Sequence, residues 1–336
     1  MNRSARISPK PKAVAGVESN MGTPQSSRAL GCLVAACLAL GCGAHEFRVL
    51  GSIDCVPHSP GSVTASDYDA AHDVVALGYG DGSFELRRDA TKLQVCGEHS
   101  KPISNLAFAP DGAVVATGDR GGRVALSHVD ARVTEPLIEL TSEVLGLAFS
   151  PSGSLIALSA GPEVVLVDRL GARKALASLQ GAVGAVTFSP DGRHLIAAGG
   201  RLTFLSVPEL RVERSVSIRG EGIGEAAVAT DVRFSPDGHS LGVLLLSGAA
   251  ILNLDNGQLA TSGAGRLNPV GLRFAPDGRL AVFGRHGLYV GPAEPERIGS
   301  ESSGTAGELA DVEFRRDGSL LVVGGPLVPN PSAPHP

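Results

Sequence analysis

Apolar and polar positions along this chain follow a pattern that recurs at intervals of 39 to 46 residues. Short runs that are apolar at every position, such as residues 155–158, 195–198 and 320–323, come directly after a turn. A strand of that kind must be covered on both faces. Each run is followed by a Gly-rich turn, by an alternating segment such as residues 123–127, and by a weaker fourth segment such as residues 93–96. The pattern predicts units of four short antiparallel strands.

A five-residue turn motif opens each unit. In most copies a Phe is followed by a small residue, Pro, Asp and Gly, and the six copies begin at Phe108, Phe149, Phe188, Phe234, Phe274 and Phe314. Pro presets φ at about −65°, Asp bonds the following backbone, and Gly accepts a positive φ. The Asp and Gly positions of this turn are Asp111, Gly112, Gly153, Asp191, Gly192, Asp237, Gly238, Asp277, Gly278, Asp317 and Gly318. Tyr68 heads a degenerate seventh copy. These residues are assigned to turn structure.

Seven units of four strands predict one all-β domain over residues 46–325, a seven-bladed β-propeller of four-stranded antiparallel blades. The last unit lacks its outer strands, because residues 326–336 carry five prolines and are expected to form a disordered tail. Residues 47–50 and 53–56 are expected to complete that blade as one strand or two, which closes the ring.

Several residues of the second unit resemble the WD-repeat family. His99 stands where that family has the His of its Gly-His pair, and Thr117 stands at the Ser or Thr partner. Asp81 lies at the turn Asp of the first unit. The chain has no Trp, and Arg87 and Ser127 occupy two of the Trp positions. The resemblance is therefore to the degenerate, Pro-Asp-Gly-rich bacterial branch of the family, and it implies a binding scaffold.

The first 45 residues follow a different pattern. Residues 1–28 have no periodic apolar positions and are expected to be disordered. Residues 29–41 form an uncharged stretch that is too short to span a bilayer as a helix and fits the apolar part of a signal peptide. The stretch ends in Leu-Gly-Cys, which resembles the lipobox of bacterial lipoproteins and implies lipidation at Cys42, with Cys37 as the alternative.

Other readings of this segment stay open. A plainly cleaved signal peptide and a buried internal helix are the alternatives, and Met21 is an alternative start of translation. The lipoprotein resemblance implies a protein of the bacterial cell envelope that touches the membrane through its lipid anchor only. Gly43 follows the Cys, which by the same resemblance favours the outer membrane over the inner one.

Composition narrows the function classes. The net charge is −5 and no basic footprint is present, so a nucleic-acid partner is not expected. Cys55 and Cys96 are the two cysteines that remain after removal of the signal segment and lipidation of Cys42. In an oxidising compartment they form either a disulfide or two buried free thiols. They are expected on the fourth strands of neighbouring blades, where bonding requires Cα atoms within about 7 Å.

The sequence offers no catalytic motif. Its nine His residues show no His-x-His or His-Glu-x-x-His spacing, and no Gly-x-Ser-x-Gly elbow is present. Residues 220–224 are Gly-rich but lack the Lys-Ser/Thr ending of a phosphate-binding loop. We therefore predict no catalytic residue, metal site or cofactor.

Two function classes follow. The first is a non-catalytic binding or assembly scaffold of the cell envelope that holds unidentified protein partners on propeller loops, with the joining loops at residues 219–229 and 299–307 as the expected binding face. The alternative is an enzyme or cofactor-carrying propeller that uses the axial channel. That alternative needs several His, Arg or acidic side chains on the inner strands, which are expected to offer mainly Leu, Val, Ala and Thr.

Overall fold

The computed structural model describes residues 48–49, 63–88, 91–130, 133–218, 227–246, 248–262, 269–285, 287–293, 309–315, 318 and 320–324. The chain divides into two compact units, Met1–His45 and Glu46–Pro336, and every described residue belongs to the second. All elements in the described ranges are β-strands. No helix in those ranges has the length and apolar character needed to cross a membrane. The predicted signal segment, with Cys37 and Cys42, lies outside the described residues.

Six blades of consecutive antiparallel strands form most of the second unit. Blade 1 consists of β2 (Val63–Asp69), β3 (Val74–Tyr79), β4 (Ser83–Arg88) and β5 (Thr91–Glu98). Blade 2 consists of β6 (Ile103–Phe108), β7 (Val114–Asp119), β8 (Arg123–His128) and β9 (Val133–Glu139). Blade 3 consists of β10 (Gly146–Phe149), β11 (Leu155–Ala160), β12 (Glu163–Asp168) and β13 (Arg173–Ser178). Blade 4 consists of β14 (Val183–Phe188), β15 (His194–Gly199), β16 (Arg201–Ser206) and β17 (Val212–Ser217). Blade 5 consists of β18 (Ala229–Phe234), β19 (Ser240–Leu245), β20 (Gly248–Asn253) and β21 (Leu259–Ser262). Blade 6 consists of β22 (Pro269–Phe274), β23 (Leu280–Gly284) and β24 (Gly287–Gly291).

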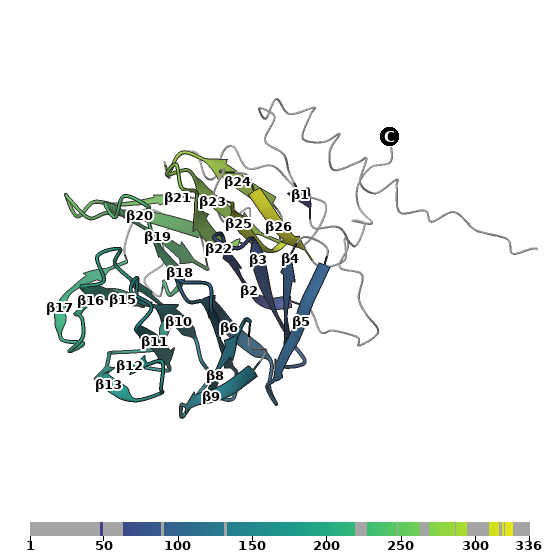
Figure 1. Ribbon diagram of the computed structural model, residues 1–336. Helices are drawn as coiled ribbons and strands as arrows, with labels where there is room; N and C mark the ends of the chain where they lie inside the picture. Colours follow the sequence, from purple (N-terminus) through teal and green to yellow (C-terminus); the bar gives the residue numbers. More distant parts are fainter. Residues whose placement is uncertain are drawn as a thin grey trace, which may run out of the picture. The chain divides into compact units, whose positions relative to one another are not determined.

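The first strand of each blade lies on the inside of the ring (Figure 1). Neighbouring inner strands contact one another in the order β2, β6, β10, β14, β18 and β22. A hairpin of β25 (Leu309–Phe314) and β26 (Leu320–Gly324), called here the closing hairpin, fills the remaining gap, because β25 contacts both β22 and β2. The inner strands therefore form a closed circle.

The expectation of an all-β propeller is confirmed, but the prediction of seven four-stranded antiparallel blades is wrong. The structure has six blades of three or four strands, and the last repeat supplies only the closing hairpin in the described ranges. The N-terminal strand β1 (Arg48–Val49) is two residues long and pairs with β26 in parallel. Residues 53–56 lie outside the described residues. The turn motif misled the prediction because it marks only the first hairpin of a repeat and carries no information on the outer strands.

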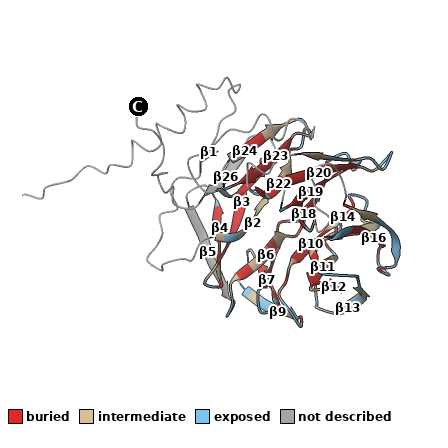
Figure 2. Cartoon of the chain, turned by 180° about the vertical axis from the view of Figure 1, so that it is seen from behind, coloured by how far each residue is buried: buried red, intermediate tan, exposed pale blue. Residues whose placement is uncertain are grey.

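The hydrophobic core lies between the faces of neighbouring blades. One cluster joins blades 2 and 3 around Leu126, Ile156 and Leu158, and another joins blades 4 and 5 around Ile196 and Leu241. Burial is greatest on the second and third strands, such as β11 and β12, and lowest on the outermost strands, such as β9 and β13 (Figure 2). Second strands such as β3 and β7 are buried at every position, as a strand covered on both faces requires. The apolar runs of the sequence thus lie between blades.

Candidate functional site

The repeated turns lie at the ends of the inner strands. The strands β6, β10, β14, β18, β22 and β25 each end at the Phe of the motif. The Gly of each turn has a positive φ, for example 67° at Gly112 and 71° at Gly192. Residues other than Gly rarely adopt this backbone conformation. In four copies the Asp carboxylate accepts a hydrogen bond from the backbone N–H two residues later, as Asp191 does from Arg193 at 3.0 Å. Asp317 lies outside the described residues.

The electrostatics of these turns fit a capping role. The hydroxyl of Ser189 and the backbone N–H of Arg193 lower the pKa of Asp191, and the hydroxyl of Ser235 acts in the same way on the pKa of Asp237. Both carboxylates are exposed and stay ionised at neutral pH. Hydrogen bonds that satisfy the turn backbone account for these Asp residues without invoking catalysis.

A buried polar network occupies the WD-like positions of blade 2. His99 Nδ1 lies 2.9 Å from Asp119 Oδ2, and His99 Nε2 lies 2.8 Å from Thr117 Oγ1. All three side chains are nearly inaccessible to solvent. The carboxylate comes from Asp119, at the end of β7, whereas Asp81 of blade 1 accepts from Ser83 in its own turn. Where a Trp would complete the network, Ser127 is instead within 2.7 Å of Thr134 Oγ1 on β9.

A second polar network lies on the inner wall of the ring. The guanidinium of Arg273 on β22 contacts Glu313 Oε1 at 2.5 Å, Asp311 Oδ2 at 2.9 Å and Asp231 Oδ2 at 3.1 Å. Ser66 on β2 donates to Asp311 at 2.6 Å. One arginine therefore links blades 5 and 6 to the closing hairpin, and Asp311 extends the link to blade 1. We call this set of five residues the axial clasp.

Burial perturbs the titration of the clasp. It raises the pKa of Glu313 to about 8, although the charge of Arg273 opposes the shift. Burial also raises the pKa of Asp67 on β2, against the hydrogen bond that it accepts from the Phe108 N–H at 2.7 Å. Although burial lowers the pKa of Arg273, the neighbouring carboxylates, chiefly Asp311, raise it well above its usual value. Perturbed groups of this kind occur both in functional sites and in structural ion networks.

The expectation that the inner strands carry mainly Leu, Val, Ala and Thr was wrong for half of the ring. A sequence signal for the clasp existed in the residue directly before the Phe of the motif, which is Arg273 in one repeat and Glu313 in the next. Period-2 alternation directs that residue to the face of the strand opposite the neighbouring Phe. The contact between Asp231 and Arg273 could not be read from spacing, because it joins different blades.

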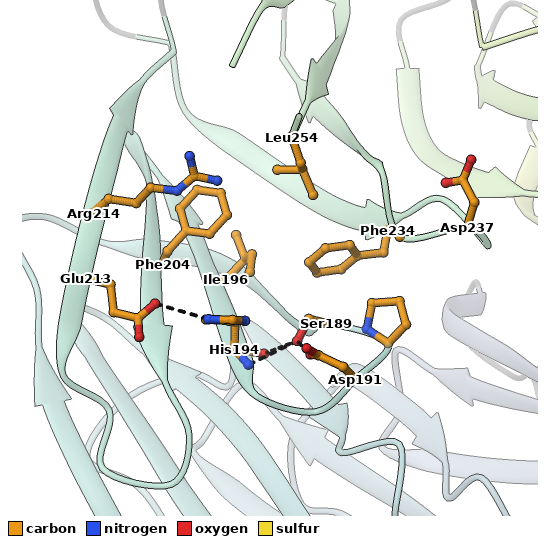
Figure 3. A pocket seen from close by; sticks show the side chains of 12 residues that line it. Ser189, Asp191, His194, Ile196, Phe204, Glu213, Arg214, Phe234, Asp237 and Leu254 are labelled. Carbon is orange, nitrogen blue, oxygen red and sulfur yellow. Dashed lines mark hydrogen bonds and ion pairs between the residues drawn. The ribbon is translucent and has the colours of Figure 1, made fainter. Parts of the chain in front are cut away.

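A groove lies between blades 4 and 5 where their turns meet (Figure 3). Its volume is about 370 Å³, at the small end of the range for ligand pockets, and apolar side chains of Ile196, Phe204, Phe234 and Leu254 line it. Charged residues surround these side chains: Asp191, Glu213, Arg214 and Asp237, with His194 Nε2 at 3.3 Å from Glu213. No sequence pattern predicted this groove, because its two walls come from different repeats.

Several predicted positions cannot be placed. Cys55 lies outside the described residues, and Cys96 falls in β5, of whose side chains nothing is described, so the disulfide stays a prediction. The loop at residues 219–229 is described only from residue 227, and residues 299–307 are outside the described ranges. Within the part of the chain that the structure describes, no group of three His, Cys, Asp or Glu residues is placed to hold a metal ion.

Comparison with known proteins supports the repeat assignment. Residues 90–126 match the WD40 family, described as "WD domain, G-beta repeat", and this segment contains His99, Thr117 and Asp119. The chain is also similar to the periodic tryptophan protein 2 homolog of Neurospora crassa, with 30% identity over 160 residues. That match covers 39% of this chain and 18% of the relative. The chain is therefore an all-β propeller in which residues 90–126 are similar to the WD40 repeat.

Proposed function

We propose that this protein is a non-catalytic scaffold that binds protein partners on the loops and turns of its propeller. One observation carries the proposal: the charged side chains of the axial clasp bond to one another between blades 5 and 6 and the closing hairpin. Arg273 is bound to three carboxylates, and only 12% of its side chain is exposed. An enzyme or cofactor carrier that uses the axial channel needs such groups presented to a ligand, and a clasp saturated by its own partners does not present them.

The comparisons support the same class of function. WD40 repeats build rigid rings whose blades differ at their exposed ends, and loops can vary there without disturbing the scaffold. The relative from Neurospora is matched over 18% of its length, so its whole-protein role does not carry over to this chain. The partner of this chain follows from neither comparison.

The cellular setting is a separate part of the proposal. The apolar run at residues 29–41 and Cys42 support a lipid-anchored protein of the bacterial cell envelope. Metabolic labelling with a fatty-acid probe should mark the wild-type chain and not a Cys42→Ala variant. Equal labelling of the two proteins would remove Cys42 as the anchor, and Cys37→Ala would then test the alternative.

Site-specific photo-crosslinking tests the scaffold function in the producing cell. A photoreactive residue at Pro208, in the turn between β16 and β17, probes the end of the blades that carries the Phe-motif turns, called here the turn face. A photoreactive residue at Ser142, between blades 2 and 3, probes the other end, where loops join one blade to the next, called here the joining-loop face. Leu176, which is exposed on the outer strand β13, serves as the control position. We expect a discrete crosslinked species from at least one face and none from Leu176. The absence of a crosslink from both faces would contradict a scaffold.

The joining-loop face is the proposed binding face, and it has its own test. Replacing residues 219–229 by a two-residue Gly linker should weaken crosslinking to the partner and leave the thermal unfolding midpoint nearly unchanged, because surface loops tolerate shortening. If crosslinking survives this change and also survives trimming of residues 299–307, the binding face lies elsewhere.

A further inference from the structure

An arginine binds the same three groups at two junctions between neighbouring blades. At the junction of blades 2 and 3, Arg169 donates from Nη2 to Asp111 Oδ2 at 2.9 Å and from Nε to the Gly153 carbonyl at 2.5 Å. Its guanidinium carbon also lies 5.8 Å from the centre of the Phe149 ring. The arginine is thus bound by the Asp of one turn and by the Gly carbonyl and Phe of the next.

The second case uses the equivalent residues of blade 6 and the closing hairpin. Arg279 donates from Nε to Asp277 Oδ2 at 2.7 Å and from Nη2 to the Gly318 carbonyl at 3.0 Å, and it lies 5.8 Å from the Phe314 ring centre. Arg279 comes from the turn itself, whereas Arg169 follows a third strand. Two arginines from different chain positions therefore occupy one kind of site, which the Asp, the Gly carbonyl and the Phe define.

The groove between blades 4 and 5 contains these three groups, and among the described residues no arginine side chain bonds to the Asp or to the Gly carbonyl. Asp191, Gly238 and Phe234 occupy the equivalent positions, and Leu254 follows β20 where Arg169 follows β12. Within the described ranges, Asp191 accepts only from Ser189 Oγ at 2.5 Å and from the Arg193 N–H, and the Gly238 carbonyl accepts no hydrogen bond.

Glycine surroundings show the same contrast. A Cβ atom added at Gly153 would lie 2.6 Å from Arg169 Nη2, and one at Gly318 would lie 3.1 Å from Arg279 Nη2. At Gly238 the nearest atom would be Pro190 Cγ at 3.5 Å. The place that a guanidinium fills at the other two junctions is open at this one.

Charge and shape favour a cation at this groove. Three carboxylates surround it, and the one nearby guanidinium of the lining, Arg214, lies 4.0 Å from the centre of the Phe204 ring, across the groove from Asp191 (Figure 3). Asp191 is ionised at neutral pH, and the hydrogen bonds that it accepts from the Ser189 hydroxyl and the Arg193 N–H lower its pKa further. The partly exposed side chain of Leu254 can pack against the methylene groups of a long side chain, above the buried Ile196.

We propose that this groove is a receptor for an arginine side chain of a partner protein. Asp191 and the Gly238 carbonyl accept from the guanidinium, the Phe234 ring lies beside it, and Leu254 packs against its stem. Arginine is favoured over lysine because a planar guanidinium can bond two acceptors and stack on an aromatic ring together. The inference rests on the proposed scaffold function and adds a second contact, at the repeated turns and separate from the joining loops, together with the chemistry of one partner side chain.

The test uses the whole chain and a defined probe, the acetylated and amidated peptide Gly-Leu-Arg-Leu-Gly. Methyl NMR of Ile196 and Leu254 should show saturable shifts at millimolar peptide. Asp191→Asn should weaken binding by about tenfold or more, since a charge-assisted hydrogen bond is lost. Asp111→Asn is the matched control: its carboxylate already binds Arg169, so peptide affinity should not change. A peptide with Lys in place of Arg should bind more weakly than the Arg peptide.

A second variant supplies the arginine from within the chain. Leu254→Arg should place a guanidinium against Asp191 as Arg169 does at its junction, and should abolish peptide binding, whereas Leu254→Met should retain it. The proposal is wrong if wild-type protein shows no shift, if Asp191→Asn binds as well as wild type, or if a folded Leu254→Arg variant still binds. A crosslinked partner together with any of these results would overturn the arginine site and leave the scaffold function standing.

Discussion

The inner wall of the ring is built in two different ways. The residues directly before the Phe, and two positions earlier, are small or neutral in blades 2 to 4 and include charges in the rest of the ring. In blades 2 to 4 they are Ala107, Asn105, Ala148, Gly146, Thr187 and Ala185. In blades 5 and 6, the closing hairpin and blade 1 they are Arg233, Asp231, Arg273, Gly271, Glu313, Asp311, Asp67 and Ala65.

The small-residue half closes by direct approach of the backbones. A Cβ at Gly146 would lie 2.7 Å from Ser159 Oγ and 2.9 Å from the Val186 N of the next blade. Asn105 Nδ2 donates to the carbonyls of Val144 at 3.3 Å and Leu145 at 3.0 Å. In the charged half, the axial clasp spans the inner strands instead. One repeat pattern therefore accommodates two kinds of contact between inner strands, close backbone approach and ion pairs. The ends of the ring meet in the half that uses the ion pairs.

Removing the arginine of the clasp should have the largest effect. Arg273→Met leaves Asp311 and Glu313 without their cation and Asp231 with Arg233 alone, and losing one partner of a buried ion network costs about 3–5 kcal/mol of unfolding free energy. Urea denaturation measures the loss. Arg233→Met is the control, because its side chain is 45% exposed and its single carboxylate contact should be worth less than about 1 kcal/mol. Equal losses in the two variants would mean that the clasp does not support ring closure.

The charged half should also make stability depend on pH. Burial raises the pKa of Glu313 to about 8, so between about pH 5 and 8 the folded protein holds a proton that the unfolded chain releases. Stability should therefore fall as pH rises through this window, by at most about 1.4 kcal/mol per pH unit for this group. Glu313→Gln should flatten that part of the curve, as followed by urea midpoints at each pH.

The turn carboxylates respond in a different window. Hydrogen bonds lower the pKa of Asp191 and Asp237, so their contribution is present at neutral pH and is lost only on acidification toward and below their ordinary pKa. They leave the Glu313 window unaffected. A slope that persists in Glu313→Gln between pH 5 and 8 would assign the dependence to other groups, with Asp67 the first to test.

The small-residue half predicts an intermediate effect. Gly146→Ala forces a Cβ against Ser159 and the backbone of β14, and overpacking of this kind costs about 1–3 kcal/mol. Gly200→Ala is the matched control, since a Cβ there meets nothing within 4 Å, and its change should stay within about 0.5 kcal/mol. Thermal unfolding of both variants compares them. Tolerance of Gly146→Ala would mean that the blades can separate at no cost.

The smallest effect is expected at the WD-like network of blade 2. Thr117→Val removes the hydroxyl that bonds His99 Nε2 and should cost about 1 kcal/mol, with the shape of the side chain retained. Thr230→Val, at an exposed position of β18, should change the urea midpoint little. A neutral Thr117→Val would mean that water replaces the hydroxyl as the partner of His99.

The recurring turn motif allowed the propeller, the strand order and the position of each turn to be predicted, because these depend on local chemistry. Phe, Pro, Asp and Gly lie within five residues of one another, so each copy specifies its own hairpin. The blade count was wrong because completeness of a blade depends on strands that the motif does not include. The groove and the axial clasp were missed because their residues are adjacent in space and far apart in the chain.

By itself the sequence determined an all-β repeat ring with buried middle strands, since strand alternation and turn residues act within a single repeat. Only the tertiary structure decided that Arg273 would meet three carboxylates from other strands, and that Asp191 would face a junction with Leu254 in place of an arginine. The physical reason is that contacts between blades depend on how neighbouring repeats pack side by side. That packing places residues about 40 positions apart in contact, and no local pattern encodes which of them will pair.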